Sequence, residues 1–194
     1  AEEALELGLQ RGMLPLVGHA YEEHGAPFIT TTEILEDIMR ALPPEILRSA
    51  LGDTAPELAR LLPDLRRLFP DIPEPLELPP EQQQRYLFNA LLDFTRRLSE
   101  SCPLVILLDD LQWADESSIL LLEHLATQVP RMRLLIVITY RDIAADQGEP
   151  FRRALAQLTR QDFVTRIPLR QLGRDDVAAL LASLGGSDAP AEVI

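Results

Sequence analysis

Two continuous apolar runs constrain the fold more than any other feature of the sequence. They read LVILLDD at residues 104–110 and RLLIVITYR at residues 133–141, and the segment between them, SSILLLEHLATQV, places leucines at helical spacing. Strands that are covered on both faces, as in a parallel sheet, carry such unbroken apolar runs. The order strand, helix, strand therefore predicts an α/β fold with a right-handed parallel sheet.

Other segments extend this sheet and cover it. MLPLVGHAY at residues 13–21 and DFVTRIPLRQL at residues 162–172 predict two further strands. Apolar residues at steps of three and four predict helices over residues 1–12, 31–42, 81–101, 150–160 and 173–185, the last ended by Gly185-Gly186. Prolines divide residues 43–80 into short helices, because proline removes a backbone donor.

Two local signals predict where helices begin. Thr30-Thr31-Thr32-Glu33 fits a Thr-x-x-Glu capping box with Thr30 as the cap. Asp115 or Ser117 can cap the helix that follows the first apolar run.

Charge and composition exclude several classes of function. Eighteen basic and thirty-one acidic residues give a net charge of −13, without a basic stripe, so direct DNA binding by this segment is not expected. No apolar run approaches the roughly 20 residues that span a bilayer, and the first residues do not resemble a signal peptide. The single cysteine, Cys102, is expected to be a small buried residue and agrees with a reducing compartment. These features favour a cytoplasmic protein without membrane contact.

All eighteen basic residues are arginine, and the chain has no lysine. The phosphate-binding motif GxxxxGK[ST] therefore cannot be completed within these 194 residues.

Asp109 and Asp110 follow directly after the apolar residues of the first run. Adjacent carboxylates at the end of a buried strand need water, a hydrogen-bond donor or a cation. In a parallel sheet the ligand site lies beyond the carboxyl ends of the strands, where one acid can hold hydrated Mg²⁺ and the other can orient an attacking water. The alternative is an ordinary strand end with solvated charges.

The surrounding sequence resembles a known family. VILLDDLQWADESSILLLEHLA followed by LLIVITYRD resembles the second half of the nucleotide-binding core in AAA+ and STAND-type P-loop ATPases. The similarity is strongest to the module of large LuxR-type transcriptional regulators and of bacterial adenylate/guanylate cyclase-associated proteins. GHAYEEHGAPF, PELARLLPDLRRLFPDIPEP and LTRQDFVTRIPLRQLGRDDVAALL resemble other segments of this family, so the resemblance covers nearly the whole chain.

The resemblance implies roles for five residues. Asp109 would help to hold Mg²⁺, and Asp110 would polarise the hydrolytic water. Arg141 matches the sensor arginine near the γ-phosphate, with an ordinary strand-end arginine as the alternative, and Thr139 on the same strand end is assigned to the nucleotide site. Trp113 is expected to shape the turn after Asp110 by packing.

The sequence departs from the family at its start. The family opens with a strand, a glycine-rich phosphate loop and a helix, whereas this chain begins in what resembles that helix. Residues 1–172 are therefore expected to be a partial P-loop NTPase core without its first strand and phosphate loop, and residues 173–194 the start of a helical lid. The expected architecture is a three-layer sheet with helices on both faces and a helical insert at about residues 43–101, incomplete at both ends.

The resemblance implies ATP and Mg²⁺ as cofactors and an ATP-hydrolysing regulatory module as the function. An effector domain in the same parent chain is the expected partner, and self-association is a further expectation. This segment alone is expected to be inactive, since the phosphate loop supplies most of the grip on ATP. The alternative is a degenerate scaffold that binds partner proteins and no nucleotide.

Other candidate sites carry weaker signals. His19, His24 and His124 are scattered and do not predict a metal site, and no GxSxG elbow of a serine hydrolase is present. The arginine pairs at 66–67, 96–97 and 152–153 are expected to lie on solvated helix faces beside acidic residues.

Overall fold

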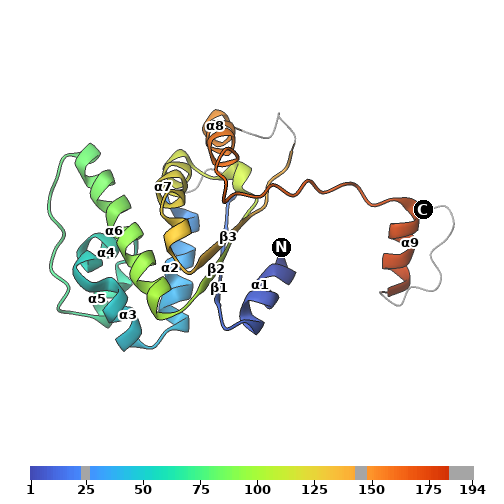
Figure 1. Cartoon of the computed structure of the whole chain (residues 1–194). Helices are drawn as coiled ribbons and strands as arrows, with labels where there is room; N and C mark the ends of the chain where they lie inside the picture. Colours follow the sequence, from blue (N-terminus) through green and yellow to red (C-terminus); the bar gives the residue numbers. More distant parts are fainter. Residues whose placement is uncertain (23–26, 143–147, 184–194) are drawn as a thin grey trace. The chain divides into compact units, whose positions relative to one another are not determined.

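The computed structural model describes residues 1–22, 27–142 and 148–183. Three strands, β1 (Leu14–His19), β2 (Leu104–Asp109) and β3 (Leu134–Ile138), form one parallel sheet in the order β1-β2-β3 (Figure 1). This confirms the predicted α/β class and the strands expected at residues 13–21, 104–110 and 133–141.

The helices also follow the predicted pattern, including the proline-divided insert. Their bounds are α1 (Glu2–Gln10), α2 (Ile29–Ala41), α3 (Pro44–Leu51), α4 (Ala55–Leu61), α5 (Asp64–Leu68), α6 (Pro80–Ser101), α7 (Glu116–Ala126), α8 (Glu149–Leu158) and α9 (Arg174–Ser183). Short 3₁₀ turns occur at Gly52–Thr54, Leu111–Trp113 and Val129–Arg131.

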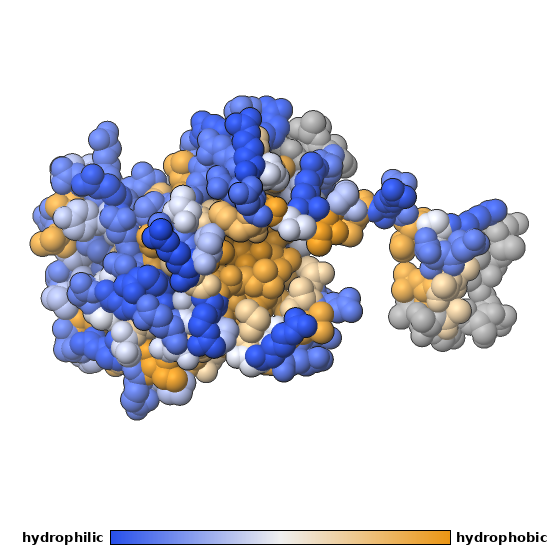
Figure 2. Space-filling model, in the orientation of Figure 1, coloured by the Kyte–Doolittle hydropathy of each residue, from blue (hydrophilic) through white to orange (hydrophobic). Residues whose placement is uncertain are grey.

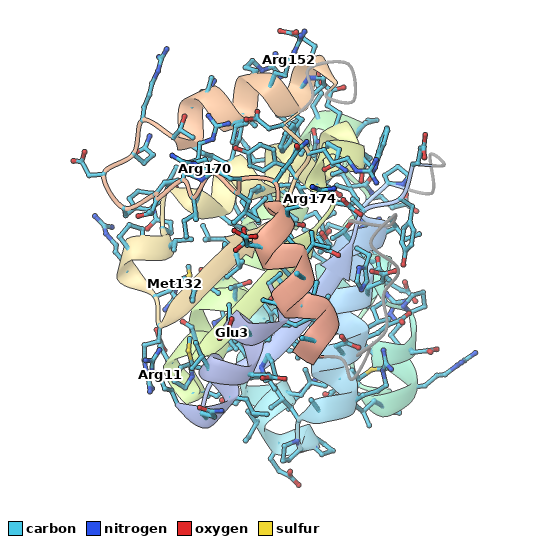
Figure 3. All side chains as sticks on the ribbon, turned by 90° about the vertical axis from the view of Figure 1, so that its right-hand side faces the viewer. Glu3, Arg11, Met132, Arg152, Arg170 and Arg174 are labelled. Carbon is cyan, nitrogen blue, oxygen red and sulfur yellow. The ribbon has the colours of Figure 1, made fainter. Side chains whose placement is uncertain are left out.

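Helices cover both faces of the sheet, as expected for three layers. Helix α1 lies against one face, where the small Gly8 allows the helix to approach Val105 of β2 closely. Figure 3 shows α1 crossing this face, with Glu3 near its start and Arg11 just past its end. Helices α2, α6 and α7 pack on the other face through the large core that includes Leu35, Phe94 and Leu121. Phe151 of α8 joins a second, smaller core beside α7.

Strand β3 is an edge of the described sheet, since β2 is the one strand paired with it among the described residues. Leu135 of this strand is 48% exposed. Figure 2 shows an apolar area in the middle of this view, where Figure 1 draws the strands. Part of the apolar surface of β3 is therefore exposed.

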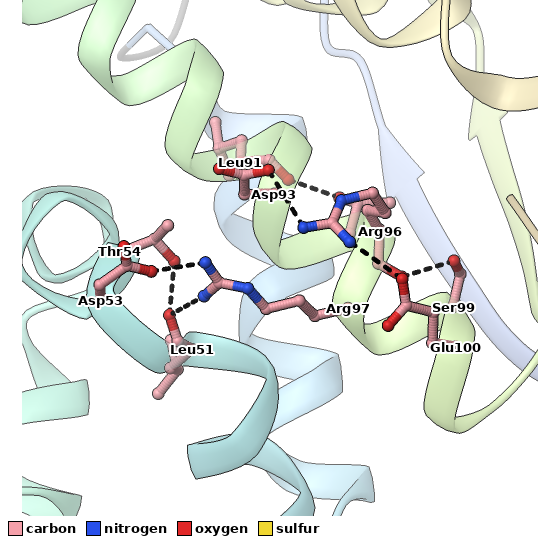
Figure 4. A network of polar contacts seen from close by, with 10 residues as sticks. Leu51, Asp53, Thr54, Leu91, Asp93, Arg96, Arg97, Ser99 and Glu100 are labelled. Atoms are coloured by element: carbon pink, nitrogen blue, oxygen red, sulfur yellow. Dashed lines mark hydrogen bonds and ion pairs between the residues drawn. The ribbon is translucent and has the colours of Figure 1, made fainter. Parts of the chain in front are cut away.

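Arg97 of α6 holds the turn between α3 and α4 against the long helix α6 (Figure 4). Its guanidinium donates hydrogen bonds to the Leu51 carbonyl at 3.0 Å and to Asp53 Oδ1 at 2.5 Å. The hydrogen bond from Arg97 lowers the pKa of the Asp53 carboxyl below its usual value. Gly52 lies between these two acceptors with φ +48°, and a Cβ placed on it would lie 2.2 Å from Arg97 Nη1. Only glycine fits this position without displacing the arginine.

We expect Gly52→Ala to destabilise the chain by about 2–3 kcal/mol, because it adds backbone strain and breaks the Arg97 contacts. Gly12→Ala is the matched control, since Gly12 also has a positive φ, +73°, but nothing within 4 Å of an added Cβ. The control should lose about 1 kcal/mol from strain alone. Urea unfolding of both variants measures the difference, and equal losses would show that Arg97 does not restrain this turn.

The predicted capping box at the start of α2 is wrong. The helix begins at Ile29 after Phe28, which has φ +65° and no side-chain cap. The Thr30 hydroxyl instead donates to the His19 carbonyl at 2.9 Å, and the Glu33 carboxylate accepts from the His19 amide at 3.0 Å. Both side chains are therefore drawn to the end of β1 and are not used for the first turn of their own helix.

The predicted strand at residues 162–172 is also wrong. These residues, all of them described, form no strand, and Ile167 and Leu169 are 75% and 90% exposed. Pro168 and the intervening Arg166 and Arg170 break the apolar run. A strand needs a neighbour for its backbone donors and acceptors, and no described strand pairs with this segment.

The chain divides into two compact units, Ala1–Phe163 and Val164–Ile194. The second unit contains α9, which confirms the helix expected from residue 173, whereas Gly185-Gly186 lie outside the described residues. The expected boundary between core and lid at residue 172 stays a prediction. None of the described helices has the length and apolar character needed to cross a bilayer.

Two expectations about single side chains need adjustment. Cys102 is half-buried, and this burial raises the pKa of its thiol. Five of the six arginines in the pairs form ion pairs with acidic residues, and Arg153 forms none with any described residue. Arg97 is only 24% exposed and also binds the Leu51 carbonyl, so it is a structural residue.

Candidate functional site

The two predicted acids lie at the carboxyl edge of the sheet. Asp109 is the last residue of β2 and stands opposite His19, the last residue of β1. Asp110 follows with φ +53°, in the left-handed region that aspartate tolerates better than most residues. This turn directs the two neighbouring carboxylates into different surroundings.

Thr139, just past the end of β3, binds both acids. Its hydroxyl lies 2.5 Å from Asp109 Oδ1 and 3.0 Å from the Asp110 amide nitrogen. Because an amide can only donate, the hydroxyl accepts from Asp110 and donates its own hydrogen to the Asp109 carboxylate. The Thr139 backbone is fixed in turn by Leu108 and Leu111, with N···O distances of 3.0 Å to each. The structure thus brings Thr139 to both acids, and its role in the nucleotide site stays a prediction.

Gln112 connects Asp110 to Arg141. Its Nε2 donates to Asp110 Oδ1 at 3.0 Å, and its Oε1 accepts from the Arg141 amide at 3.1 Å. The side chain is buried, with 4% of its surface exposed. Asp110 Oδ2 makes no hydrogen bond to any described residue. One oxygen of Asp110 is therefore anchored and the other is open.

His19 contributes a further contact to the site. Its Nδ1 lies 3.7 Å from Asp109 Oδ2, on the side of the carboxylate away from Thr139. Glu33 and Thr30 hold the backbone of His19 through the bonds described above. Asp109 is consequently flanked by two polar side chains, one from the end of β1 and one from the residue that follows β3.

Asp115 caps α7, which confirms the first of the two expected caps and not Ser117. It accepts from the Ser118 amide at 3.1 Å and from the Ser118 hydroxyl at 2.5 Å. Its Oδ2 also accepts from the Phe28 amide at 3.2 Å. Asp115 therefore also binds the start of α2 to the turn that follows Asp110.

A comparison with known protein families gives a match over most of the chain. The family model described as the AAA ATPase domain matches residues 2–138, well over half of the chain. The chain belongs to the AAA ATPase domain family. Neither the curated proteins nor the solved structures contain a match. The segment that matches the AAA ATPase domain includes both acids and ends with the last residue of β3, so Thr139 and Arg141 follow directly after it.

The AAA ATPase family uses ATP and Mg²⁺, and the residues of this site fit that ion. No group of three or more His, Cys, Asp or Glu residues that could hold a metal occurs in the described part of the chain. Mg²⁺ needs no such group, because it is usually held by one or two carboxylates with water and substrate phosphates. Asp109, 38% exposed at the edge of the sheet, offers one such carboxylate.

The sequence predicts that the two acids lie at this strand end, which the structure confirms, but it does not predict two contacts that the structure shows there. Gln112 carries no sequence signal, because an amide in a turn has no distinctive pattern. His19 does carry a signal, since it lies near the end of a predicted strand, where a parallel sheet places its site residues. His24 lies outside the described residues. The Arg141 side chain is exposed, and its sensor role stays a prediction.

Proposed function

We propose that this AAA ATPase domain binds and hydrolyses ATP with Mg²⁺ as a regulatory module of a multidomain signalling protein. The observation that carries the proposal is the unequal fixation of the two acids. Asp109 is bound by Thr139 and flanked by His19, whereas Asp110 has one anchored and one open oxygen. Such a difference suits two carboxylates with two different tasks.

Each residue then has a task. Asp109 holds Mg²⁺, directly or through water, and the ion neutralises charge on the phosphates when it is bound. Asp110 uses its open Oδ2 to orient the attacking water and to accept its proton. Thr139 keeps Asp109 in place, and Arg141 senses the γ-phosphate with its fixed charge.

In this proposal, the loop that binds the ATP phosphates lies outside these 194 residues. The chain has no lysine and hence no GxxxxGK[ST] loop. We infer that the full-length protein supplies this loop upstream of Ala1, that an effector domain follows, and that the parent is a LuxR-type transcriptional regulator. Residues 1–194 alone are then inactive.

Calorimetric titration of ATP, with and without Mg²⁺, tests the proposal. The full-length protein should bind ATP and gain affinity from Mg²⁺, whereas residues 1–194 alone should bind it weakly or not at all. In Asp109→Ala, the increase in ATP affinity caused by Mg²⁺ should be at least about tenfold smaller than in the wild type, because a metal ligand is removed.

Glu116→Gln is the control, since this exposed acid lies in the first turn of α7 and not in the acid pair. It should bind as the wild type does. A full-length protein that binds no ATP, or whose upstream sequence lacks a phosphate loop, would instead support the alternative function, a scaffold that binds partner proteins and no nucleotide.

A further inference from the structure

The side chain of Gln112 is buried, so its amide can form hydrogen bonds only with the groups packed around it. A buried amide that lacks partners destabilises a protein, so its donor and acceptor must both be used. The partners here are Asp110 Oδ1 at 3.0 Å and the Arg141 amide at 3.1 Å. Both belong to the strand ends that carry the candidate site.

The chemistry of these partners fixes the orientation of the amide. The Arg141 backbone N–H can only donate, and an ionised Asp110 can only accept. Rotating the amide by 180° would place donor against donor and acceptor against acceptor. Gln112 therefore holds one orientation while both partners stay in place.

Segment 139–141 controls both acids through these contacts. The Thr139 hydroxyl donates a hydrogen bond to the Asp109 carboxylate and accepts one from the Asp110 amide. Gln112 adds the link from the Asp110 carboxylate to the backbone at residue 141. A shift of this segment would move the anchor of Asp110 as well as the support of Asp109.

We propose that Gln112 is a positioning residue that holds the Asp110 carboxylate for hydrolysis and ties its orientation to the backbone at residue 141. This inference rests on the proposed ATPase function. It assigns Gln112 no contact with ATP. Removing its amide should therefore change the rate of hydrolysis and leave the affinity for ATP unchanged.

Kinetics of the full-length protein test this with two variants. Gln112→Leu keeps the size of the side chain and removes both hydrogen bonds, and Gln112→Glu keeps an acceptor for Arg141 but places a second charge against Asp110. Both should lower kcat by about 10- to 100-fold, since a small misplacement of a reacting group has effects of this size, and the Kd for ATP should stay within about twofold.

Two further variants and a measurement of thermal unfolding separate a positioning role of Gln112 from a structural one. Gln112→His, whose neutral ring offers one donor and one acceptor, should retain more turnover than Gln112→Leu. Gln128→Leu is the matched control, because Gln128 is half-buried and makes no side-chain hydrogen bond to any described residue. Thermal unfolding should show Gln112→Leu still folded at the assay temperature, since leucine leaves no buried polar atom of its own.

Hydrogen exchange of the Arg141 amide in residues 1–194 tests the contact without ATP. Gln112→Leu should make this amide exchange about two- to tenfold faster, as expected for the loss of one hydrogen bond. Unchanged exchange, unchanged kcat, or a parallel loss of ATP binding would each overturn the inference. A wild-type protein without turnover would overturn the proposed function and the positioning role together, while the exchange result would still report the contact.

Discussion

Asp110→Asn in the full-length protein should keep ATP affinity within about twofold and reduce turnover by about 10²- to 10⁴-fold, the usual contribution of a positioned general base. The carboxylate accepts the proton of the attacking water in the proposed mechanism, and an amide cannot. The effect should therefore fall on kcat. Single-turnover hydrolysis and an ATP titration measure the two quantities separately.

The surroundings of Asp110 make asparagine a clean replacement. Asparagine tolerates the left-handed backbone at φ +53° as aspartate does. Its Oδ1 can still accept from Gln112, so the turn keeps its hydrogen bond. Glu116→Gln is again the control for the loss of one negative charge near this turn, and it should hydrolyse ATP normally. Unchanged turnover in the Asp110→Asn protein would refute the role of this residue.

Phe94→Ala should destabilise residues 1–194 by about 3–5 kcal/mol, the usual loss for a buried aromatic ring. Phe94 of α6 is 2% exposed and lies in the core that joins the insert to the sheet. It already lines a cavity of about 80 Å³ between the sheet and helices α2, α6 and α7. Truncation would enlarge this void, because a core relaxes only partly around a lost side chain.

Tyr86→Ala on the same helix provides the control for Phe94. Tyr86 is 44% exposed, so its removal should cost less than about 1 kcal/mol. Urea unfolding followed by circular dichroism gives both values. Similar losses for the two variants would show that α6 does not pack on the sheet through Phe94.

The elements that the sequence predicted well are those whose signals are local and continuous. Strand β3 is apolar throughout and β2 is apolar up to Asp109, while α6 carries its leucines and Phe94 at regular helical steps. Asp115 lies directly before its helix and caps it as expected. In these cases the residues that decide the structure are neighbours in the chain.

The wrong predictions arose where tertiary contacts compete with local ones. Thr30 and Glu33 have the spacing of a capping box, yet both bind His19 of a neighbouring strand. Phe163, Ile167 and Leu169 alternate with other residues as in a strand, yet a strand forms only beside a partner. No local pattern reveals which of these contacts prevails.

The candidate site shows the same division. Asp109 and Asp110 can be predicted as site residues from the sequence, because two charges after a buried strand are unusual. Gln112 and His19 were not found, because their importance depends on β1, β2 and β3 ending at one edge of the sheet. Such a role becomes visible only when the strands are aligned.

A crystal structure of the full-length protein with Mg²⁺ and a non-hydrolysable ATP analogue tests the central claim most directly. An Asp109 oxygen should lie about 2.1 Å from the ion, or reach it through one bound water, with the open oxygen of Asp110 turned toward the γ-phosphate. A nucleotide bound away from this edge of the sheet, or an ion held without Asp109, would contradict the account.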